Sequence, residues 1–204
     1  DRDPYAPVLV FLHEGLGCVE LWRGFPEALC ARVGLRGFAY DRTGYGKSGG
    51  WSRPPGTRYM EIEGDQILPE VLDAVGVGAC LLIGHSDGGS IALIFAGAFP
   101  DVPLGVVALA PHEFVEDVTL AGILAAREAW TATDLPAKLA RHHRDAARVF
   151  AEWHEIWLSP EFRAWNIEDC LPAIRCPVLA IQGEDDEYAT MRQIEVIAEQ
   201  VADT

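Results

Sequence analysis

The chain has 204 residues, half of them hydrophobic, and a formal net charge of −15. This length suits a single domain with a sizeable core, and the negative charge argues against nucleic acid or a membrane as a partner. The five cysteines lack CxxC spacing and are odd in number, which favours reduced thiols in a cytoplasmic protein over disulfides or a metal site.

The first predicted element is a buried strand. Residues 8–12 form a continuous apolar run, as in a central strand, and no signal-peptide pattern precedes them. A glycine-rich segment follows at residues 13–17. Open α/β sheets place their sites at the carboxyl ends of strands, so we expect this segment to belong to a site. Trp22, Phe25 and Val33 then recur at helical spacing and predict a helix.

A second strand and a second helix are expected next. Residues 37–40 predict a short strand that runs into a tight, glycine-containing loop at residues 41–48. Between residues 60 and 75, apolar side chains recur on one helical face. Pro69 lies within that stretch and predicts a kink or a late helix start, because proline has no backbone N–H to donate.

The third predicted strand, residues 79–83, leads into the segment on which the functional prediction depends. Residues 84–88, Gly-His-Ser-Asp-Gly, separate this strand from an apolar helix at residues 90–99 and match the nucleophile elbow G-x-S-x-G. In that elbow a serine projects from a strained turn, and only small residues fit two positions before and after it. The serine is Ser86, and the turn directs the amide of Asp87 at the oxyanion that forms when the serine attacks a carbonyl.

Residues 106–110 predict a fourth strand, which ends just before His112. The most apolar stretch, residues 91–111, is interrupted by Pro100 and Pro103, so we expect a helix, a turn and a strand there rather than a membrane span. Strands and helices alternate up to this point. This order predicts the α/β class, with a mostly parallel sheet and crossover helices on its faces.

No strand is predicted between residues 114 and 170. Three helices are expected there: residues 118–130, 135–143 and 146–158. Four of the six tryptophans also lie in this block, which favours an aromatic-lined helical cap over the strand ends. Ordinary helix packing would place tryptophans on helical faces as well. The core would then consist of residues 1–113 and 171–204.

Residues 177–182 predict a fifth strand, followed by the acidic segment 183–187. Thr190 is expected to cap a last helix, with Gln193 placed to complete a capping box.

Three separated motifs agree with one another. A strand ending in His-Glu-Gly-Leu-Gly, a loop Asp-Arg-Thr-Gly-Tyr-Gly-Lys-Ser and the elbow Gly-His-Ser-Asp-Gly-Gly occur in that order, before a later strand and Gly-Glu-Asp-Asp. Together they resemble the α/β-hydrolase family over nearly the whole chain. The resemblance implies a parallel sheet with flanking helices and identifies residues 114–170 with the family's variable cap.

The resemblance also implies roles for individual residues. Ser86 stands at the position of the nucleophile, and Asp186, three residues beyond Gly183, stands at that of the catalytic acid. The oxyanion hole would pair the amide of Asp87 with that of Gly15. Three further residues are expected to contact the substrate: Leu16, Trp22 and His112.

One member of the family's triad has no counterpart. The family order is Ser, Asp, His, but no histidine follows Asp186. We expect the chain to be part of a longer hydrolase. The chain would lack the first strands and the last strand of that enzyme, and the catalytic histidine would lie beyond residue 204. The alternative is an internal base, for which His112 is the best candidate. Missing strands would expose two sheet edges, which favours a homodimer.

The sequence therefore predicts a serine hydrolase that cleaves a small-molecule carboxylic ester through an acyl-enzyme on Ser86. A carbon–carbon bond hydrolase of the same fold is the enzymatic alternative. A binding protein without catalysis, or an inactive fragment, is the alternative from another class. No metal or organic cofactor is expected.

Overall fold

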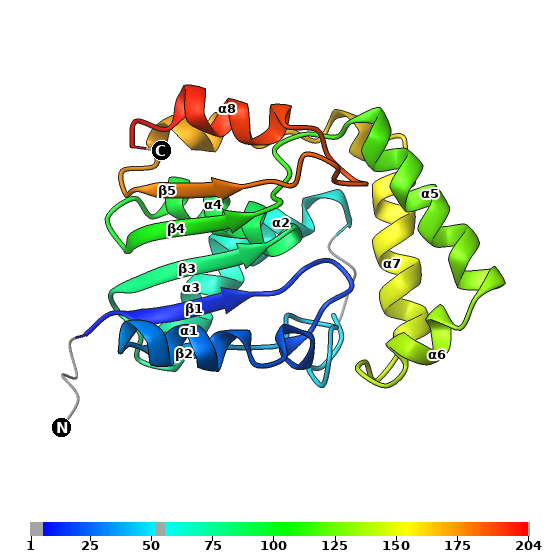
Figure 1. Cartoon of the computed structure of the whole chain (residues 1–204), viewed down its shortest axis with the longest axis horizontal. Helices are drawn as coiled ribbons and strands as arrows, with labels where there is room; N and C mark the ends of the chain where they lie inside the picture. The colour runs from blue at the N-terminus through cyan, green and yellow to red at the C-terminus, as the bar shows by residue number, and fades with distance from the viewer. Residues whose placement is uncertain (1–5, 52–55, 204) are drawn as a thin grey trace.

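Five parallel strands form one sheet at the centre of the computed structural model, which describes residues 6–51 and 56–203 (Figure 1). The sheet has the order β2-β1-β3-β4-β5, with these bounds: β1 Val8–Leu12, β2 Arg36–Ala39, β3 Cys80–His85, β4 Pro103–Leu109 and β5 Val178–Ile181. Because every pair of neighbours is parallel, all five carboxyl ends meet at one edge. The predicted α/β class is confirmed.

Helices cover both faces of the sheet. α1 (Phe25–Val33) lies in front of the sheet in Figure 1, and α4 (Asp87–Ala98) lies behind it. α8 (Arg192–Gln200) runs beside β5. Short 3-10 helices occur at Val19–Trp22, Gly56–Arg58, Phe162–Ala164 and Glu168–Ala173. Within the described residues, none of the helices combines the length and the apolar character needed to cross a membrane.

The segment predicted as one helix between residues 60 and 75 consists of three pieces. α2 (Tyr59–Ile62) continues into a π-helical turn at Glu63–Ile67, and α3 (Leu68–Ala74) follows. The backbone stays helical at Ile67 and Leu68, so these pieces form one continuous helix and the expected late start is not seen. Pro69 follows the π-helical turn, so the helix is irregular next to the residue that lacks a backbone N–H.

Three helices stand across the carboxyl ends of the strands (Figure 1). They are α5 (Asp117–Ala132), α6 (Leu135–Leu139) and α7 (Ala146–Leu158). α5 and α7 lie where the sequence predicts them, whereas α6 ends at Leu139 and not at residue 143 as expected. Trp130 stacks on Phe150 with ring centroids 4.2 Å apart, and this contact joins α5 to α7. The three helices thus cover the edge at which the sequence motifs converge. Their function as a cap remains a prediction.

The capping box expected at the start of α8 does not form. Gln193 is fully buried, and its side chain bonds to residues outside α8. Its Oε1 accepts a hydrogen bond from the amide of Glu113 at 2.7 Å, and its Nε2 donates to Glu116 at 2.7 Å. Thr190 accepts the amide of Arg192, the first residue of α8, on its Oγ1 at 3.2 Å, and it donates its own amide to Glu116 at 2.9 Å. These contacts fasten the start of α8 to the segment that leads into α5.

The two faces of the sheet are covered unequally. The larger core cluster includes α4, whereas the cluster beside α1 contains three buried side chains: Leu9, Phe11 and Ile83. The register places Leu179 and Ile181 of β5 opposite Val107 and Leu109 of β4. Both β5 side chains are largely exposed, at 56% and 48%. The sheet therefore presents apolar surface at its β5 side.

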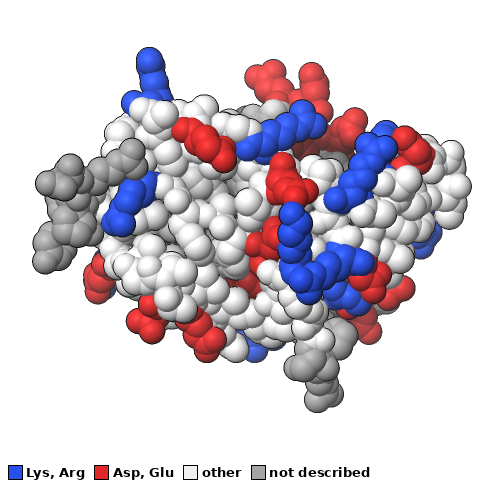
Figure 2. All heavy atoms as spheres, turned by 90° about the horizontal axis from the view of Figure 1, so that it is seen from below, with Lys and Arg blue, Asp and Glu red and all other residues white. Residues whose placement is uncertain are grey.

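Charges of both signs are mixed on the surface. Figure 2 shows one face, seen from below Figure 1, on which acidic and basic side chains lie close together between wide uncharged areas. Ion pairs join some of the surface charges, such as Arg175 with Asp101 at 2.9 Å. Exposed pairs of this kind contribute about 1 kcal/mol or less each, so we attribute the stability of the fold to its core.

Candidate active site

Ser86 occupies a strained turn between β3 and α4. Its backbone has φ 51° and ψ −120°, a conformation that side-chain-bearing residues rarely adopt. Its amide donates to the carbonyl of Leu109 at 2.8 Å, and its carbonyl accepts from the amide of Gly89 at 2.7 Å. Ala110, at the end of β4, also has a positive φ of 46°. Two of the three non-glycine residues with positive φ in the described part of the chain thus lie at the carboxyl ends of β3 and β4.

The glycines on either side of Ser86 are required by close backbone contacts. A Cβ at Gly84 would overlap the carbonyl group of Gly88. A Cβ at Gly88 would overlap the carbonyl oxygen of Leu12 on β1. The predicted need for small residues at both positions is therefore confirmed by the geometry.

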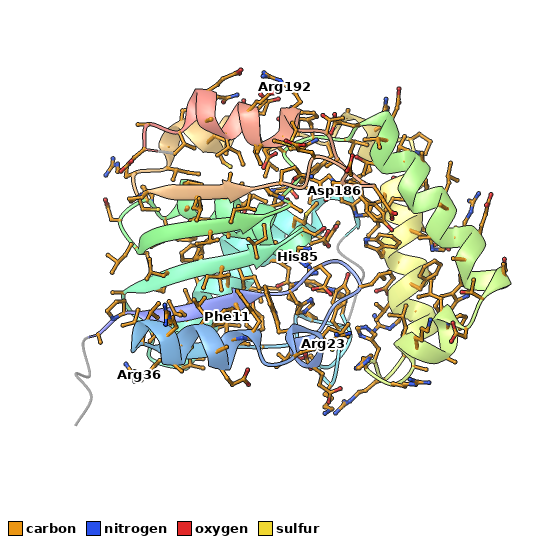
Figure 3. The ribbon with its side chains drawn as sticks, in the orientation of Figure 1. Phe11, Arg23, Arg36, His85, Asp186 and Arg192 are labelled. Atoms are coloured by element: carbon orange, nitrogen blue, oxygen red, sulfur yellow. The ribbon has the colours of Figure 1, made fainter. Side chains whose placement is uncertain are left out.

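A cavity of about 200 Å³ opens beside Ser86, between the strand ends and the helices above them. Figure 3 shows His85 at the tip of β3 and Asp186 on the loop after β5, both at this edge of the sheet. α5 and α7 supply part of the cavity's apolar wall. The side chains and backbone that line the cavity belong to Glu14, Gly15, Leu16, His85, Ser86, Asp87, Ala110, His112, Thr119, Ile123, Trp153, Trp157, Asp186 and Tyr188.

The two amides expected to form the oxyanion hole belong to residues that both line this cavity. Asp87 is the first residue of α4, and Gly15 lies in the loop after β1. A Cβ on Gly15 would lie 2.5 Å from Nε1 of Trp153 and 3.2 Å from Oδ1 of Asp87. Only glycine leaves room for this approach, so Gly15 and Asp87 lie against each other beside Ser86.

Asp186 lies in the same cavity as Ser86. It is half-buried on the loop between β5 and α8, and its Oδ1 accepts a hydrogen bond from the amide of Tyr188 at 2.8 Å. The structure therefore brings together the serine and the carboxylate that sequence reasoning selected, although 100 residues separate them in the chain.

His112 also lines the cavity, but both of its ring nitrogens are otherwise engaged or enclosed. Nε2 lies 3.3 Å from the carbonyl oxygen of Tyr188, and since a carbonyl only accepts, Nε2 carries the hydrogen. Nδ1 is buried without a hydrogen-bond partner among the described residues. Burial lowers the pKa of His112, against the opposing effect of Tyr188, so the ring is neutral near pH 7.

Of the two other residues predicted to contact the substrate, one lines the cavity and the other does not. Leu16 lines the cavity beside Ser86. Trp22 does not, because the 3-10 helix that carries it directs the ring onto the α1 face of the sheet. There it stacks on Phe25 and meets Phe11 edge-on, with both centroid distances at 5.7 Å. This corrects the expectation for Trp22.

A buried polar network adjoins the cavity, and the sequence analysis missed it. Oδ2 of Asp87 accepts hydrogen bonds from the hydroxyl of Tyr59 at 2.9 Å and from Nη2 of Arg42 at 3.4 Å. Nε1 of Trp157, on α7, donates to the same tyrosine hydroxyl at 3.1 Å. Arg42 belongs to the loop 41–48 that the sequence singled out, but no pattern indicated that its side chain turns inward. No sequence signal pointed to Tyr59.

Glu63, on the π-helical turn, also faces Arg42 and is fully buried. Neither carboxylate oxygen has a side-chain or backbone partner among the residues described. Burial raises the pKa of Glu63 from the usual 4.5 to about 7, although the charge of Arg42 acts in the opposite direction. The folded chain therefore holds a proton that the unfolded chain releases at lower pH.

This proton gives a testable dependence of stability on pH. The contribution of Glu63 to the free energy of unfolding is expected to decrease as pH rises from 4.5 to about 7, because the unfolded state binds fewer protons there. Glu63→Gln removes this titration. The free energy of unfolding of the variant, relative to that of the wild type, should therefore increase by about 3 kcal/mol as pH rises across this range. Urea unfolding at several pH values measures the gap, with the exposed Glu70→Gln as control. A gap that does not change with pH would contradict the prediction.

Comparison with known proteins agrees with this geometry. Residues 7–162 match the sequence profile of the family described as the alpha/beta hydrolase fold. The chain belongs to the α/β-hydrolase family. Within the described residues, no group of three or more histidine, cysteine or acidic side chains is arranged to hold a metal ion.

Several members of the α/β-hydrolase family are similar to the chain. The sn-1-specific diacylglycerol lipase of Mus musculus is 30% identical over 141 residues, which cover 68% of this chain and 43% of the lipase. Epoxide hydrolase B of Mycobacterium tuberculosis is 33% identical over 109 residues, covering 52% of this chain and 29% of that enzyme. The chain thus spans less than half the length of these curated relatives.

Solved structures of the family share the fold. A carboxylesterase of Nitrososphaera gargenis superimposes with a TM-score of 0.72 and 23% identity, over 98% of this chain and 80% of the esterase. A hydrolase from Pseudomonas aeruginosa gives a TM-score of 0.70 and 21% identity, over 99% of this chain and 81% of that structure. Together these comparisons show the fold of the α/β-hydrolase family.

Proposed function

We propose that the protein is a serine hydrolase that cleaves carboxylic esters through an acyl-enzyme on Ser86. The observation that carries this proposal is the strained turn at φ 51°, which holds a serine hydroxyl at the cavity beside a helix N-terminus. The identity of the residue also matters. A serine at this position suits acyl transfer, whereas epoxide opening in this fold requires an attacking carboxylate.

The mechanism follows from the residues around the cavity. Oγ of Ser86 attacks the ester carbonyl, and its proton passes to a general base. The amides of Asp87 and Gly15 hold the negative charge of the tetrahedral intermediate, and Asp186 orients the base. Collapse of the intermediate expels the alcohol, and water then hydrolyses the acyl-enzyme.

For the general base, we propose a histidine carried by residues beyond 204, as the family resemblance implies. Two observations argue against His112 as the base. Nε2 of His112 is held by the carbonyl of Tyr188, and Nδ1 of His112 is buried. The contact that would orient an added histidine is Asp186, which lines the same cavity as Ser86. His112 is proposed instead to form part of the substrate-binding wall with Leu16.

The size and lining of the cavity favour a small, largely apolar ester. Its volume of about 200 Å³ suits a compact substrate, and Ile123, Trp153 and Trp157 supply apolar surface. The carboxylates of Glu14 and Asp186 also border the cavity, so a neutral substrate is expected to be preferred over an anion. The similar protein of Mus musculus, at 30% identity, is a diacylglycerol lipase, and this likeness supports ester chemistry.

The experiment that tests this proposal combines turnover with active-site labelling. The protein, extended past residue 204 so that it carries the proposed histidine, is incubated with p-nitrophenyl esters of increasing acyl length and, separately, with a fluorophosphonate probe; the same form serves as wild type in the labelling and turnover tests below. We expect short acyl chains to be cleaved fastest, and mass spectrometry of the digested protein to find the probe on Ser86. Absence of both turnover and labelling would favour a binding protein of the same fold.

We also propose that residues 1–204 on their own associate in pairs through the β5 edge of the sheet. The exposed side chains of Leu179 and Ile181 favour this association. Light scattering after size-exclusion chromatography should give twice the monomer mass, and Leu179→Lys should restore the monomer. Val75→Lys, which changes an exposed apolar residue at the end of α3, serves as control. A monomeric wild type would refute the proposal.

A cytoplasmic location is proposed from the thiols. Three of the five cysteines are buried free thiols: Cys18, Cys80 and Cys176. Burial raises the pKa of each of these three thiols, which keeps them in the unreactive protonated form. Such thiols are common in proteins of reducing compartments.

A further inference from the structure

Asp87 places a negative charge beside the amides proposed to bind the oxyanion. Its side chain is only 2% exposed, so water screens it little. Its Oδ1 would lie 3.2 Å from a Cβ on Gly15, so the carboxylate lies against the second amide-bearing residue as well. An unbalanced carboxylate at this place would repel the oxyanion that forms when Ser86 attacks.

Arg42 carries the opposite charge to the same place, and its position is fixed. The side chain is fully buried, with Nη2 at 3.4 Å from Oδ2 of Asp87 and at 3.0 Å from the carbonyl oxygen of Glu14. The centre of the guanidinium lies 4.5 Å from the ring centroid of Tyr45. Its own amide donates to Nε2 of His13 at 3.0 Å.

The remaining atoms of the guanidinium show why a carboxylate is needed near it. Nε and Nη1 are buried without a hydrogen-bond partner among the described residues. A buried guanidinium in such surroundings is stable only when a carboxylate balances its charge. Two carboxyl groups face Arg42, those of Glu63 and Asp87. Since burial raises the pKa of Glu63 to about 7, Asp87 is the partner that balances Arg42 below that pH.

We propose that Arg42 is a positioning residue for ester hydrolysis, whose guanidinium neutralises the Asp87 carboxylate so that it does not oppose the oxyanion. This inference rests on the proposed function of Ser86. Arg42 acts through Asp87 and does not touch the substrate. Tyr59 supports the arrangement, because its hydroxyl holds Oδ2 of Asp87 at 2.9 Å.

Labelling rates test the proposal, because phosphonylation of Ser86 also develops negative charge in the oxyanion hole. The rate constant of fluorophosphonate labelling is measured below pH 7 for wild type and for four variants: Arg42→Gln, Arg42→Lys, Asp87→Asn and the double variant Arg42→Gln/Asp87→Asn. Arg42→Gln is expected to label on the order of 10²-fold more slowly, and Arg42→Lys to stay close to the wild type. Asp87→Asn should rescue Arg42→Gln, because the charge that needed compensation is gone.

Controls and outcomes separate charge compensation from a purely structural role. Arg175→Gln removes an equal charge at a site that is 69% exposed and should leave the rate unchanged. If Arg42→Gln does not fold, the comparison of Asp87→Asn with the double variant decides, and a difference above about tenfold overturns the inference. A folded Arg42→Gln that Asp87→Asn does not rescue overturns it as well. A wild type that is never labelled refutes the proposed function itself, and the inference with it.

Discussion

Ser86→Ala is expected to abolish fluorophosphonate labelling and to reduce ester turnover to the background rate, while the fold remains intact. The substitution removes only the hydroxyl oxygen, which is the proposed acceptor of the acyl group. In serine hydrolases with a complete triad, loss of the serine lowers kcat by about 10⁶-fold. Labelling is read by mass spectrometry, turnover with p-nitrophenyl esters, and folding by circular dichroism.

Ser90→Ala is the matched control, because Ser90 lies one turn further along α4. Its buried hydroxyl donates to the carbonyl of His112 at 2.6 Å and accepts from the amide of the same residue at 3.0 Å. Losing these bonds is expected to lower stability by about 1–3 kcal/mol and to leave labelling at Ser86 in place. Equal labelling of wild type and Ser86→Ala would show that the reactive hydroxyl is elsewhere.

Gly88→Ala is expected to prevent correct folding. The added methyl group would overlap the carbonyl oxygen of Leu12, which belongs to the backbone of a central strand and cannot rotate away. Overpacking costs about 1–3 kcal/mol when side chains can adjust, so a clash with fixed backbone should cost on the order of 4 kcal/mol or more. The yield of folded protein and its urea midpoint measure the effect.

The control for this change is Gly78→Ala. Gly78 lies before β3 in open space, with nothing within 4 Å of the position that a Cβ would take. It should change stability little or raise it slightly, because alanine restricts the unfolded chain. If Gly88→Ala were as stable as Gly78→Ala, that result would contradict the close contact between Gly88 of α4 and Leu12 of β1.

The sequence predicted those features that depend on local rules. Five apolar runs gave the strands of the sheet, and the spacing of glycines around Ser86 gave the turn, because such a turn excludes any Cβ at Gly84 and Gly88. Asp186 was found by its distance from Gly183, through a family resemblance. Its place in the same cavity as Ser86 follows from parallel topology, which gathers the ends of all strands at one edge.

The features that the sequence did not predict depend on competition between distant residues. The local rule gave Gln193 a capping role, but in the folded chain the amide of Glu113 and the carboxylate of Glu116 compete for its side chain. Trp22 was expected to contact the substrate, but its ring packs on Phe11 instead. The inward turn of Arg42 depends on Asp87, which lies 45 positions further on.

The loop that carries Asp186 makes hydrogen bonds both to the core and to the helices above it. The carbonyl of Tyr188 receives both the ring of His112 at the end of β4 and the hydroxyl of Thr119 on α5, the latter at 2.6 Å. A chimera that exchanged the helical block for that of another hydrolase would therefore disturb the proposed acid as well as substrate choice. Chimeras that retain Thr119 and Glu116 would keep the contacts between the helical block and the Asp186 loop. The exchanged segment should therefore begin after Thr119.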